Sequence, residues 1–396
     1  MKILMLTPYL PYPLLSGGQI RTYNLLKNLG AKHEITLFAY IRKDSERKHV
    51  EELKKYCKKV RVFKRRPAWD IKNIIRAATS SYPFLVSIYL SSNFQEAIAQ
   101  ELKTTNYNLI HAETFYMMPN IPKTNVPIIL AEQTIEYDAY INFTKKTKLL
   151  PIKPFLYLDV YKIKKWETHF WKAATRLITM SKDDKQAIQN QLGKNVAVDV
   201  VANGVDTQFF NKMKKDLPKN PTVLFVGTFK WLPNIDAVEF LVETIWPKVL
   251  TRLPQAKLLI VGFSPSEKIK NYGKQPSITV KGDLKDIRDA YAHAHALLAP
   301  IRSGKGTRYK ILESMATSTP IIATHLAVEG IGIRNGVHAL VADSPDELAQ
   351  LTSKVLADAN LRQRLAVNSK KLVENKFNWH TISQELNRVY SKVGSQ

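Results

Sequence analysis

The chain has very little cysteine and no long apolar stretch. Among its 396 residues there is one cysteine, Cys57, which excludes an internal disulfide and a zinc site built from several cysteines and fits a reducing compartment. No apolar run approaches the roughly 20 residues that a membrane-spanning helix needs. The first apolar run, residues 3–6, is too short for a signal peptide, so we expect a core strand there.

Acidic residues are also scarce. The sequence has 34 acidic residues against 59 lysines and arginines, a formal net charge of +25. Such an excess calls for a partner with negative charge, and nucleic acid, anionic lipid and an anionic small molecule are all candidates. No RNA- or DNA-binding motif is visible, so the sequence argues against nucleic acid. The length and the 45% hydrophobic content suit two soluble domains with full cores.

The densest basic run covers residues 54–76 and contains a single acid, Asp70. Cations interleaved with exposed aromatic side chains are typical of a surface that lies against a membrane. The alternative is a solvated face whose Ile and Trp side chains point into the core. A second mixture of cations and aromatics covers residues 145–172. The residues of the first run that we expect to contact a membrane or an acceptor are Lys58, Lys59, Arg61, Lys64, Arg65, Arg66 and Trp69.

Strand-like runs alternate with helix-like segments along the first half of the chain. This alternation predicts a parallel sheet wound by right-handed crossovers. We expect strands at residues 2–7, 34–40, 60–63, 109–112, 128–131, 176–180 and 197–201, with helices at 18–29 and 45–57.

The second half repeats this pattern after a polar, proline-containing segment at residues 212–219. Its short strands, each followed by a turn or helix, predict a second doubly wound sheet, so the fold class is α/β with two Rossmann-like domains. A ligand cleft is expected between the carboxyl ends of the two sheets. Strands are expected at 222–226, 257–261, 278–280, 296–301, 321–323 and 339–341, and helices at 236–250, 345–357, 361–375 and 379–393.

Residues 304–320 are the most informative stretch, because a glycine loop there leads from a strand into a helix. The loop presents small residues, then the cations Arg308 and Lys310, then the carboxylate of Glu313. Such a helix start suits a phosphorylated ligand with a sugar hydroxyl nearby. The alternative is an ordinary strand–helix junction with solvated charges.

Several motifs occur together in one order along the chain. They are Gly17-Gly18, Asn203-Gly204-Val205-Asp206, Phe225-Val226-Gly227 and Leu312-Glu313-Ser314-Met315-Ala316. Together they resemble the retaining glycosyltransferases of family 4, which have the GT-B fold of two Rossmann-like domains facing across a cleft. Members of that family transfer a sugar from a nucleoside diphosphate donor without a metal ion.

The resemblance implies a role for each domain. Residues 1–205 would bind the acceptor and residues 206–378 the nucleotide sugar, with the last helix, 379–396, packing back on the first domain. Glu313 matches the family glutamate that accepts hydrogen bonds from the ribose hydroxyls. The donor-binding residues implied are Gly17, Gly18, Gly227, Lys230, Gly306, Thr307, Arg308, Lys310 and Glu313.

Each of these residues also has a plainer interpretation. The glycines could serve ordinary turns, Lys230 could be a solvated lysine, and Lys310 and Glu313 could form a salt bridge within their helix. In the functional interpretation, the glycines let the backbone approach the donor phosphates, and the cations neutralise the diphosphate as it leaves.

The sequence departs from the family pattern in three places. Lys305 occupies a position where many members carry a glutamate. His111 and Glu113 are both candidates for the catalytic group on the acceptor side, where the family often has a histidine. Ser318 stands where a helix-ending glycine is usual.

We therefore expect a hexosyltransferase-type enzyme with no cofactor and no metal, acting on a glycan or lipid-linked acceptor. The sequence contains no Asp-x-Asp motif of the kind that metal-dependent transferases use. The basic first domain suggests a cytoplasmic protein attached peripherally to the anionic inner face of a membrane, with no nucleic-acid partner. The alternative function is a non-catalytic protein that binds nucleotide sugars with the same fold.

Overall fold

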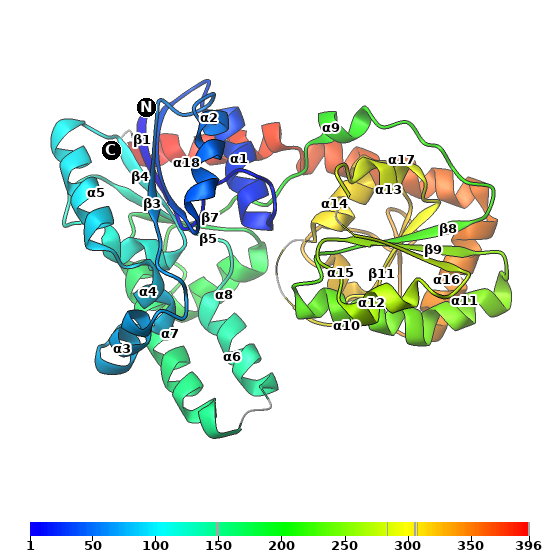
Figure 1. The fold of residues 1–396 in the computed structure, drawn as a ribbon. Coiled ribbons are helices and arrows are strands. Elements are labelled where there is room, and N and C mark those ends of the chain that lie inside the picture. The colour runs from blue at the N-terminus through cyan, green and yellow to red at the C-terminus, as the bar shows by residue number, and fades with distance from the viewer. Residues whose placement is uncertain (148–149, 283, 305, 307, 395–396) are drawn as a thin grey trace. The chain divides into compact units, whose positions relative to one another are not determined.

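The computed structural model describes residues 1–147, 150–282, 284–304, 306 and 308–394. Its contacts divide the chain into two compact units, Met1–Asn203 with Ile382–Gln396, and Gly204–Thr381. Each unit contains one parallel sheet with helices on both sides (Figure 1). The predicted α/β fold class is confirmed.

The sheet of the first unit has seven strands in the order β3-β2-β1-β4-β5-β6-β7, and all its neighbours are parallel. Parallel strands covered on both faces read as continuous apolar runs, and residues 3–6 of β1 are fully buried. The strands are β1 (Lys2–Thr7), β2 (Glu34–Ile41), β3 (Lys59–Lys64), β4 (Leu109–Glu113), β5 (Ile128–Glu132), β6 (Arg176–Thr179) and β7 (Val198–Val200).

Helices and turns of the first unit connect these strands. No helix in the described part of the chain is both long and apolar enough to cross a membrane. The elements are α1 (Gly17–Leu29), η1 (Asp44–His49), α2 (Val50–Leu53), α3 (Ile71–Thr79), α4 (Phe84–Tyr89), α5 (Ser92–Thr104), η2 (Phe115–Asn120), α6 (Glu136–Lys146), η3 (Leu150–Ile152), α7 (Lys153–Ala173) and α8 (Lys182–Leu192).

The single helix predicted over residues 45–57 is wrong. The segment folds as the 3₁₀ helix η1 followed by one α-helical turn, α2. The side chain of Glu46 accepts hydrogen bonds from the backbone N–H groups of Arg42 (3.0 Å) and Lys43 (2.8 Å). Glu46 therefore caps the start of η1 by satisfying two of its free backbone donors.

The final helix, α18 (Trp379–Gly394), belongs to the first unit from Ile382 onward. Val389 and Tyr390 are buried in it. Oδ1 of Asn387 accepts a 2.7 Å hydrogen bond from Nε2 of His33, on the turn after α1. The helix is therefore held by both apolar packing and polar contacts.

The second unit repeats the architecture with the strand order β10-β9-β8-β11-β12-β13. Its strands are β8 (Thr222–Val226), β9 (Lys257–Gly262), β10 (Ile278–Gly282), β11 (Ala296–Ala299), β12 (Ile321–Ala323) and β13 (Leu340–Val341). Its helices are α9 (Thr207–Asn211), α10 (Leu232–Phe240), η4 (Leu241–Ile245), α11 (Trp246–Arg252), α12 (Glu267–Tyr272), α13 (Arg288–Ala292), α14 (Tyr309–Ala316), α15 (His325–Val328), α16 (Pro345–Ala357) and α17 (Ala359–Lys376).

The helix predicted over residues 236–250 starts earlier and is interrupted. It begins at Leu232 as α10, passes through the π-helical turn η4, and restarts at Trp246 as α11. Pro247 explains the interruption, because its ring clashes with the preceding turn and it has no N–H to donate. The wider π turn relieves both problems and places Pro247 in the first turn of α11.

Both sheets place their first strand in the middle. β1 lies between β2 and β4, and β8 lies between β9 and β11. The connections on the two sides of such a strand run in opposite directions, which leaves a crevice at its carboxyl end. This place is the switch point of the sheet. Each unit therefore has one place in its sheet that suits a ligand.

Three glutamates gather where β5 leads into α6. Glu167 of α7 accepts hydrogen bonds from the backbone N–H groups of Glu136 (2.8 Å) and Tyr137 (3.1 Å), so it caps α6. Glu132 accepts a 2.9 Å bond from Nε1 of Trp171. Burial raises the pKa of Glu132 to about 8 and that of Glu136 to about 7, and it raises the pKa of Glu167 well above its ordinary value.

The raised pKa of Glu132 should be visible in the stability of the protein. Between about pH 4.5 and 8 the folded state holds more protons than the unfolded state, so the free energy of unfolding falls as the pH rises. Glu132→Gln should flatten this dependence and make the protein more stable than the wild type at pH 8, by on the order of 4 kcal/mol. Urea unfolding at pH 5, 6.5 and 8 measures both effects. The exposed Glu96→Gln is the control, and parallel profiles for Glu132→Gln and wild type would contradict the assignment.

Candidate functional site

The predicted site residues lie at the switch point of each sheet. His111 and Glu113 lie on β4, and Gly17 and Gly18 open α1, which follows the neighbouring strand β1. The remaining donor-side residues follow β8 and β11, which are neighbours in the second sheet.

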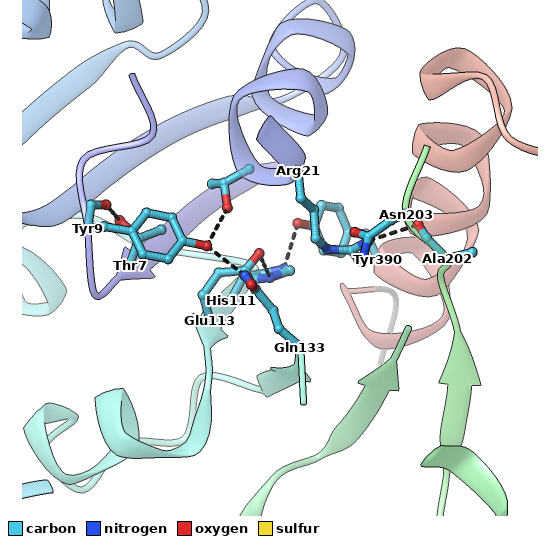
Figure 2. A network of polar contacts seen from close by, with 10 residues as sticks. Thr7, Tyr9, Arg21, His111, Glu113, Gln133, Ala202, Asn203 and Tyr390 are labelled. Atoms are coloured by element: carbon cyan, nitrogen blue, oxygen red, sulfur yellow. Dashed lines mark hydrogen bonds and ion pairs between the residues drawn. The ribbon is translucent and has the colours of Figure 1, made fainter. Parts of the chain in front are cut away.

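In the first unit, a chain of hydrogen bonds connects four elements (Figure 2). Nε2 of His111 lies 3.2 Å from Oε1 of Glu113, and Nε2 of Gln133 donates to the other carboxylate oxygen at 2.7 Å. Gln133 also donates to the hydroxyl of Tyr9 at 2.6 Å. At the other end, the hydroxyl of Tyr390 in α18 lies 2.8 Å from Nδ1 of His111. The network joins β4, the end of β5, the loop after β1 and the final helix.

One neutral tautomer of His111 satisfies this network. A carboxylate accepts hydrogen bonds, so Nε2 of His111 carries the proton and donates it to Glu113. Nδ1 is then the acceptor for the hydroxyl of Tyr390. The ring is fully buried and both of its nitrogens are engaged, so this geometry makes His111 a residue that positions Glu113.

Glu113 is held in its charged form although it is fully buried. Burial by itself raises the pKa of a carboxyl group. Here the hydrogen bond and the electrostatic attraction of the His111 ring, the positive charge of Arg21 and the hydrogen bond from Gln133 together outweigh burial and lower the pKa. Arg21 is itself anchored, since Nη1 donates to the carbonyl of Ala202 at 2.8 Å. The first unit thus has a fixed negative charge at the carboxyl end of β4, next to the switch point of its sheet.

The glycines at the start of α1 lie directly above this network. A Cβ atom on Gly18 would come within 2.5 Å of the Tyr9 hydroxyl and 2.8 Å of Oε1 of Gln133. The helix is capped by Ser16, whose Oγ accepts from the backbone N–H of Gln19. Gly18 therefore allows the helix N-terminus, with its outward-pointing N–H groups, to approach Tyr9 and Gln133 closely.

In the second unit, the loop after β8 is held close to its neighbours. A Cβ on Gly227 would meet Cγ of Asn234 at 2.9 Å, so only glycine fits there. Lys230 is exposed, and its Nζ lies 4.8 Å from the ring centre of Phe263, which follows β9. Lys230 is thus at the rim of this crevice, where a ligand can reach it.

Lys310 is buried on the first turn of α14. Its Nζ donates to Oδ1 of Asn234 at 2.8 Å and lies 4.5 Å from the ring centre of Phe225. Burial, assisted by the charge of Arg308, lowers the pKa of Lys310 to about 7. The lysine is held by a neutral amide and an aromatic face, so its charge is left without full compensation and favours an anionic ligand.

Glu313 lies one turn further along α14. Its Oε2 accepts a 3.0 Å hydrogen bond from the hydroxyl of Tyr291, and burial raises the pKa of Glu313. Lys310 and Glu313 thus each bond to a different neighbour. The carboxylate is fixed in orientation by Tyr291 and retains acceptor capacity for a hydroxyl pair.

The loop before α14 depends on glycines in the left-handed region. Gly304 has φ +94° and Gly306 has φ +95°. Arg308 reaches back along this loop, where Nη2 donates to the carbonyl of Gly304 at 2.6 Å. Lys305 and Thr307, also singled out in the sequence, lie outside the described residues. At the other end of α14, Ser318 has φ +53°, a conformation that favours the glycine usual there.

The basic run around β3 is largely neutralised by its own neighbours. Lys58 pairs with Glu34 (2.6 Å), Lys59 with Glu101 (2.7 Å), and Lys64 with Asp44. Arg61 lies over the rings of Phe38 and Phe63, Arg65 lies over Tyr89, and Arg66 is exposed. Trp69 points into solvent with 80% of its surface exposed, so its side chain does not fill the core.

Five residues of these two networks did not stand out in the sequence: Tyr9, Arg21, Gln133, Tyr291 and Tyr390. Gln133 immediately follows β5, so the rule that ligand-binding side chains follow strand ends would have found it. Tyr390 has no comparable signal, because its partner His111 is 279 residues away.

Two family models match adjacent parts of the chain. Residues 15–209 match "Glycosyltransferase Family 4", and residues 220–358 match "Glycosyl transferases group 1". The two matches fall on the first and second sheets, respectively.

Among curated proteins, the phosphatidyl-myo-inositol mannosyltransferase of Mycobacterium tuberculosis is 28% identical over 206 residues, which is 49% of this chain and 53% of that protein. The chain thus spans about half the length of that relative. The capsular polysaccharide biosynthesis glycosyltransferase CapM of Staphylococcus aureus is 22% identical over 72% of this chain and 78% of its own.

Solved structures share the fold at low identity. Sucrose-phosphate synthase from Thermosynechococcus elongatus superposes with a TM-score of 0.71 at 16% identity, over all of both chains. Anabaena HepE in complex with UDP and glucose superposes with a TM-score of 0.67 at 16% identity, over 99% of this chain and all of its own.

The tautomer assigned to His111 can be tested directly. We expect the ¹⁵N chemical shifts of the ring to show a neutral imidazole protonated on Nε2. Tyr390→Phe should shift the Nδ1 signal and lower the free energy of unfolding by about 1–3 kcal/mol, because it leaves a buried acceptor unpaired. Tyr40→Phe is the control, since it removes a similarly buried hydroxyl that bonds to the carbonyl of Tyr89. A wild-type ring protonated on Nδ1 would show the assignment to be wrong.

Proposed function

Because this chain is built as a group 1 glycosyltransferase of the GT-B type, we propose that it moves a sugar from a nucleoside diphosphate donor to a glycan or lipid-linked acceptor. In this proposal the anomeric configuration is retained and no metal ion is used. The observation that carries it is the group of Arg308, Lys310 and Glu313 at the switch point of the second sheet. One short segment there offers two cations for a diphosphate and one carboxylate for a diol.

The second unit would bind the donor. Glu313, oriented by Tyr291, accepts hydrogen bonds from the two ribose hydroxyls. Lys310 and Arg308 lie toward the diphosphate, and Lys230 closes the rim. As the bond to the sugar breaks, negative charge grows on the leaving phosphate, and fixed cations nearby stabilise that charge.

The first unit would bind the acceptor. Glu113 is ionised and fixed by His111 and Gln133, so it orients the amide of Gln133 and the hydroxyl of Tyr9 below the start of α1. We assign His111 a positioning role and Glu113 the role of the acceptor-side carboxylate. The acceptor hydroxyl attacks from the side of the leaving group, whose phosphate oxygen takes the proton, so the protein supplies position and charge.

The mannosyltransferase and capsule-synthesis relatives suggest the kind of acceptor. Their names describe transfer to a lipid and formation of a cell-surface polysaccharide. By analogy we propose a membrane-proximal acceptor and a cytoplasmic enzyme at the inner face of the membrane. A non-catalytic nucleotide-sugar-binding protein is the alternative, and it predicts donor binding without donor hydrolysis.

The ribose assignment predicts the effect of one substitution. Glu313→Ala should weaken the binding of the preferred donor at least tenfold, because two hydrogen bonds to the ribose are lost. A tenfold loss of affinity corresponds to about 1.4 kcal/mol of binding free energy. Titration calorimetry with a panel of uridine and guanosine diphosphate sugars identifies that donor and measures its affinity. The exposed Glu267→Ala in the same unit is the control. An unchanged affinity for Glu313→Ala would rule out the ribose contact, and an absence of slow donor hydrolysis would favour the non-catalytic alternative.

Donor binding should also depend on pH through Lys310. The free protein holds this lysine with a pKa of about 7, whereas a bound diphosphate favours its charged form. Above pH 7, binding must therefore take up a proton, and the dissociation constant should rise by up to tenfold per pH unit. A nucleotide sugar is the right probe, because its diphosphate has no terminal phosphate to titrate in this range. Lys310→Met should bind weakly at every pH from 6 to 8, and a wild-type affinity that is constant over that range would contradict the role of Lys310.

A further inference from the structure

Exposed apolar side chains are concentrated on α3, on the turn that precedes it and on α7 of the first unit. Trp69 and Ile71 are 80% and 63% exposed, and Phe155 and Leu158 are 73% and 54% exposed. Single exposed apolar residues are ordinary, whereas a cluster of them marks an interaction surface. We call Trp69, Ile71, Ile74, Ile75, Phe155 and Leu158 the α3–α7 surface.

Helix α3 has the reverse of the usual arrangement of polar and apolar residues. Ile71, Ile74 and Ile75, spaced so as to share one face, are all exposed. The buried face is polar: the amide of Asn73 donates to the carbonyl of Pro67 at 2.9 Å, and Arg76 donates to the carbonyl of Leu90 at 3.1 Å. A helix that satisfies its polar side chains inside and turns isoleucines to solvent is built to contact something apolar.

Helix α7 holds α3 in a fixed position beside it (Figure 1). Nζ of Lys162 donates to the carbonyls of Ala77 (2.7 Å) and Ser80 (2.8 Å) at the end of α3. Phe155 and Leu158 precede Lys162 by seven and four residues, so they lie on the same face of α7. The apolar residues of the two helices therefore belong to neighbouring helices that are joined by hydrogen bonds.

The charges of α7 make this element cationic toward solvent. Its two acids are both used as caps inside the protein: Asp159 accepts from the backbone N–H of Phe84 at 2.7 Å, and Glu167 caps α6. Lys165 of α7 and Lys72 of α3 are exposed, whereas Nζ of Lys164 lies over the ring of Tyr137. In contrast, Lys58, just before β3, and Lys59 and Lys64 of β3 pair with carboxylates of the protein.

We propose that the α3–α7 surface docks onto the interface of an anionic lipid bilayer, with Trp69 and the isoleucines entering the headgroup region. Apolar and aromatic side chains beside cations, with no outward-facing acid on α7, match the apolar boundary and the negative surface of such a bilayer. The role of this docking rests on the proposed function, because docking would bring the enzyme to a lipid-linked acceptor. The docking itself rests on α3 and α7 alone.

Co-sedimentation of the full chain with vesicles tests the proposal. We expect binding to vesicles of phosphatidylcholine with 30% phosphatidylglycerol, and at least tenfold weaker binding to pure phosphatidylcholine. The double variant Ile74→Ser/Ile75→Ser should reduce binding to the anionic vesicles at least tenfold, and Phe155→Ser/Leu158→Ser should do the same. The control variant is Leu217→Ser, an exposed leucine of the second unit, which should bind like the wild type.

Trp69 offers a second readout. The tryptophan emission of the wild type should shift to shorter wavelength on addition of anionic vesicles, and Trp69→Phe should remove most of that shift. If the wild type does not pellet with anionic vesicles at low salt, the proposal is wrong. It is also wrong if the serine variants pellet like the wild type, or if they instead abolish a dimer detected by light scattering, since the surface would then bind a second copy of the chain.

Donor hydrolysis in the absence of vesicles separates this proposal from the proposed function. The serine variants should hydrolyse donor at the wild-type rate, because their substitutions lie outside the donor site. Vesicle binding without any donor hydrolysis would overturn the enzymatic function and leave the docking surface supported. Hydrolysis without vesicle binding would overturn the docking surface alone.

Discussion

The central position of the first strand in each sheet is the constraint on which both candidate sites depend. β1 and β8 each have later strands on either side, so the connections that follow neighbouring strands diverge and leave the carboxyl edge open. The side chains that follow these strands meet there without being close in sequence. Right-handed crossovers then place helices on both faces, which bury the strands and leave that edge accessible.

Burial has opposite consequences for the key ionisable groups of the two units. Glu113 and Lys310 are both buried, yet Glu113 stays charged and the pKa of Lys310 falls to about 7. The difference lies in their neighbours, because Glu113 receives hydrogen bonds from His111 and Gln133, whereas Lys310 meets one neutral amide and an aromatic ring. The charge of Glu113 is therefore already compensated by its neighbours in the first unit. The charge of Lys310 in the second unit would be stabilised by an anion that binds beside it.

The same reasoning explains why α3 is of interest. Local rules place isoleucine inside and asparagine outside, and α3 does the reverse at Ile74 and Asn73. Such a violation is maintained where a partner replaces the solvent. The polar contacts of Asn73, Arg76 and Lys162 help to hold the helix in place, which leaves its isoleucines available.

The sequence alone determined the strands of both sheets, because parallel strands buried on two faces appear as short apolar runs, and it determined that Arg308, Lys310 and Glu313 share one helix start. The sequence did not determine which charged side chains pair within the protein and which face the solvent. In the sequence, the lysines at the start of β3 look as exposed as those of α7. In the folded chain, Glu34 and Glu101 pair with Lys58 and Lys59, whereas the acids of α7, Asp159 and Glu167, turn inward. Periodicity and spacing act within a segment, whereas the partner of a charge, like the pairing of His111 with Tyr390 across 279 residues, is chosen by tertiary packing.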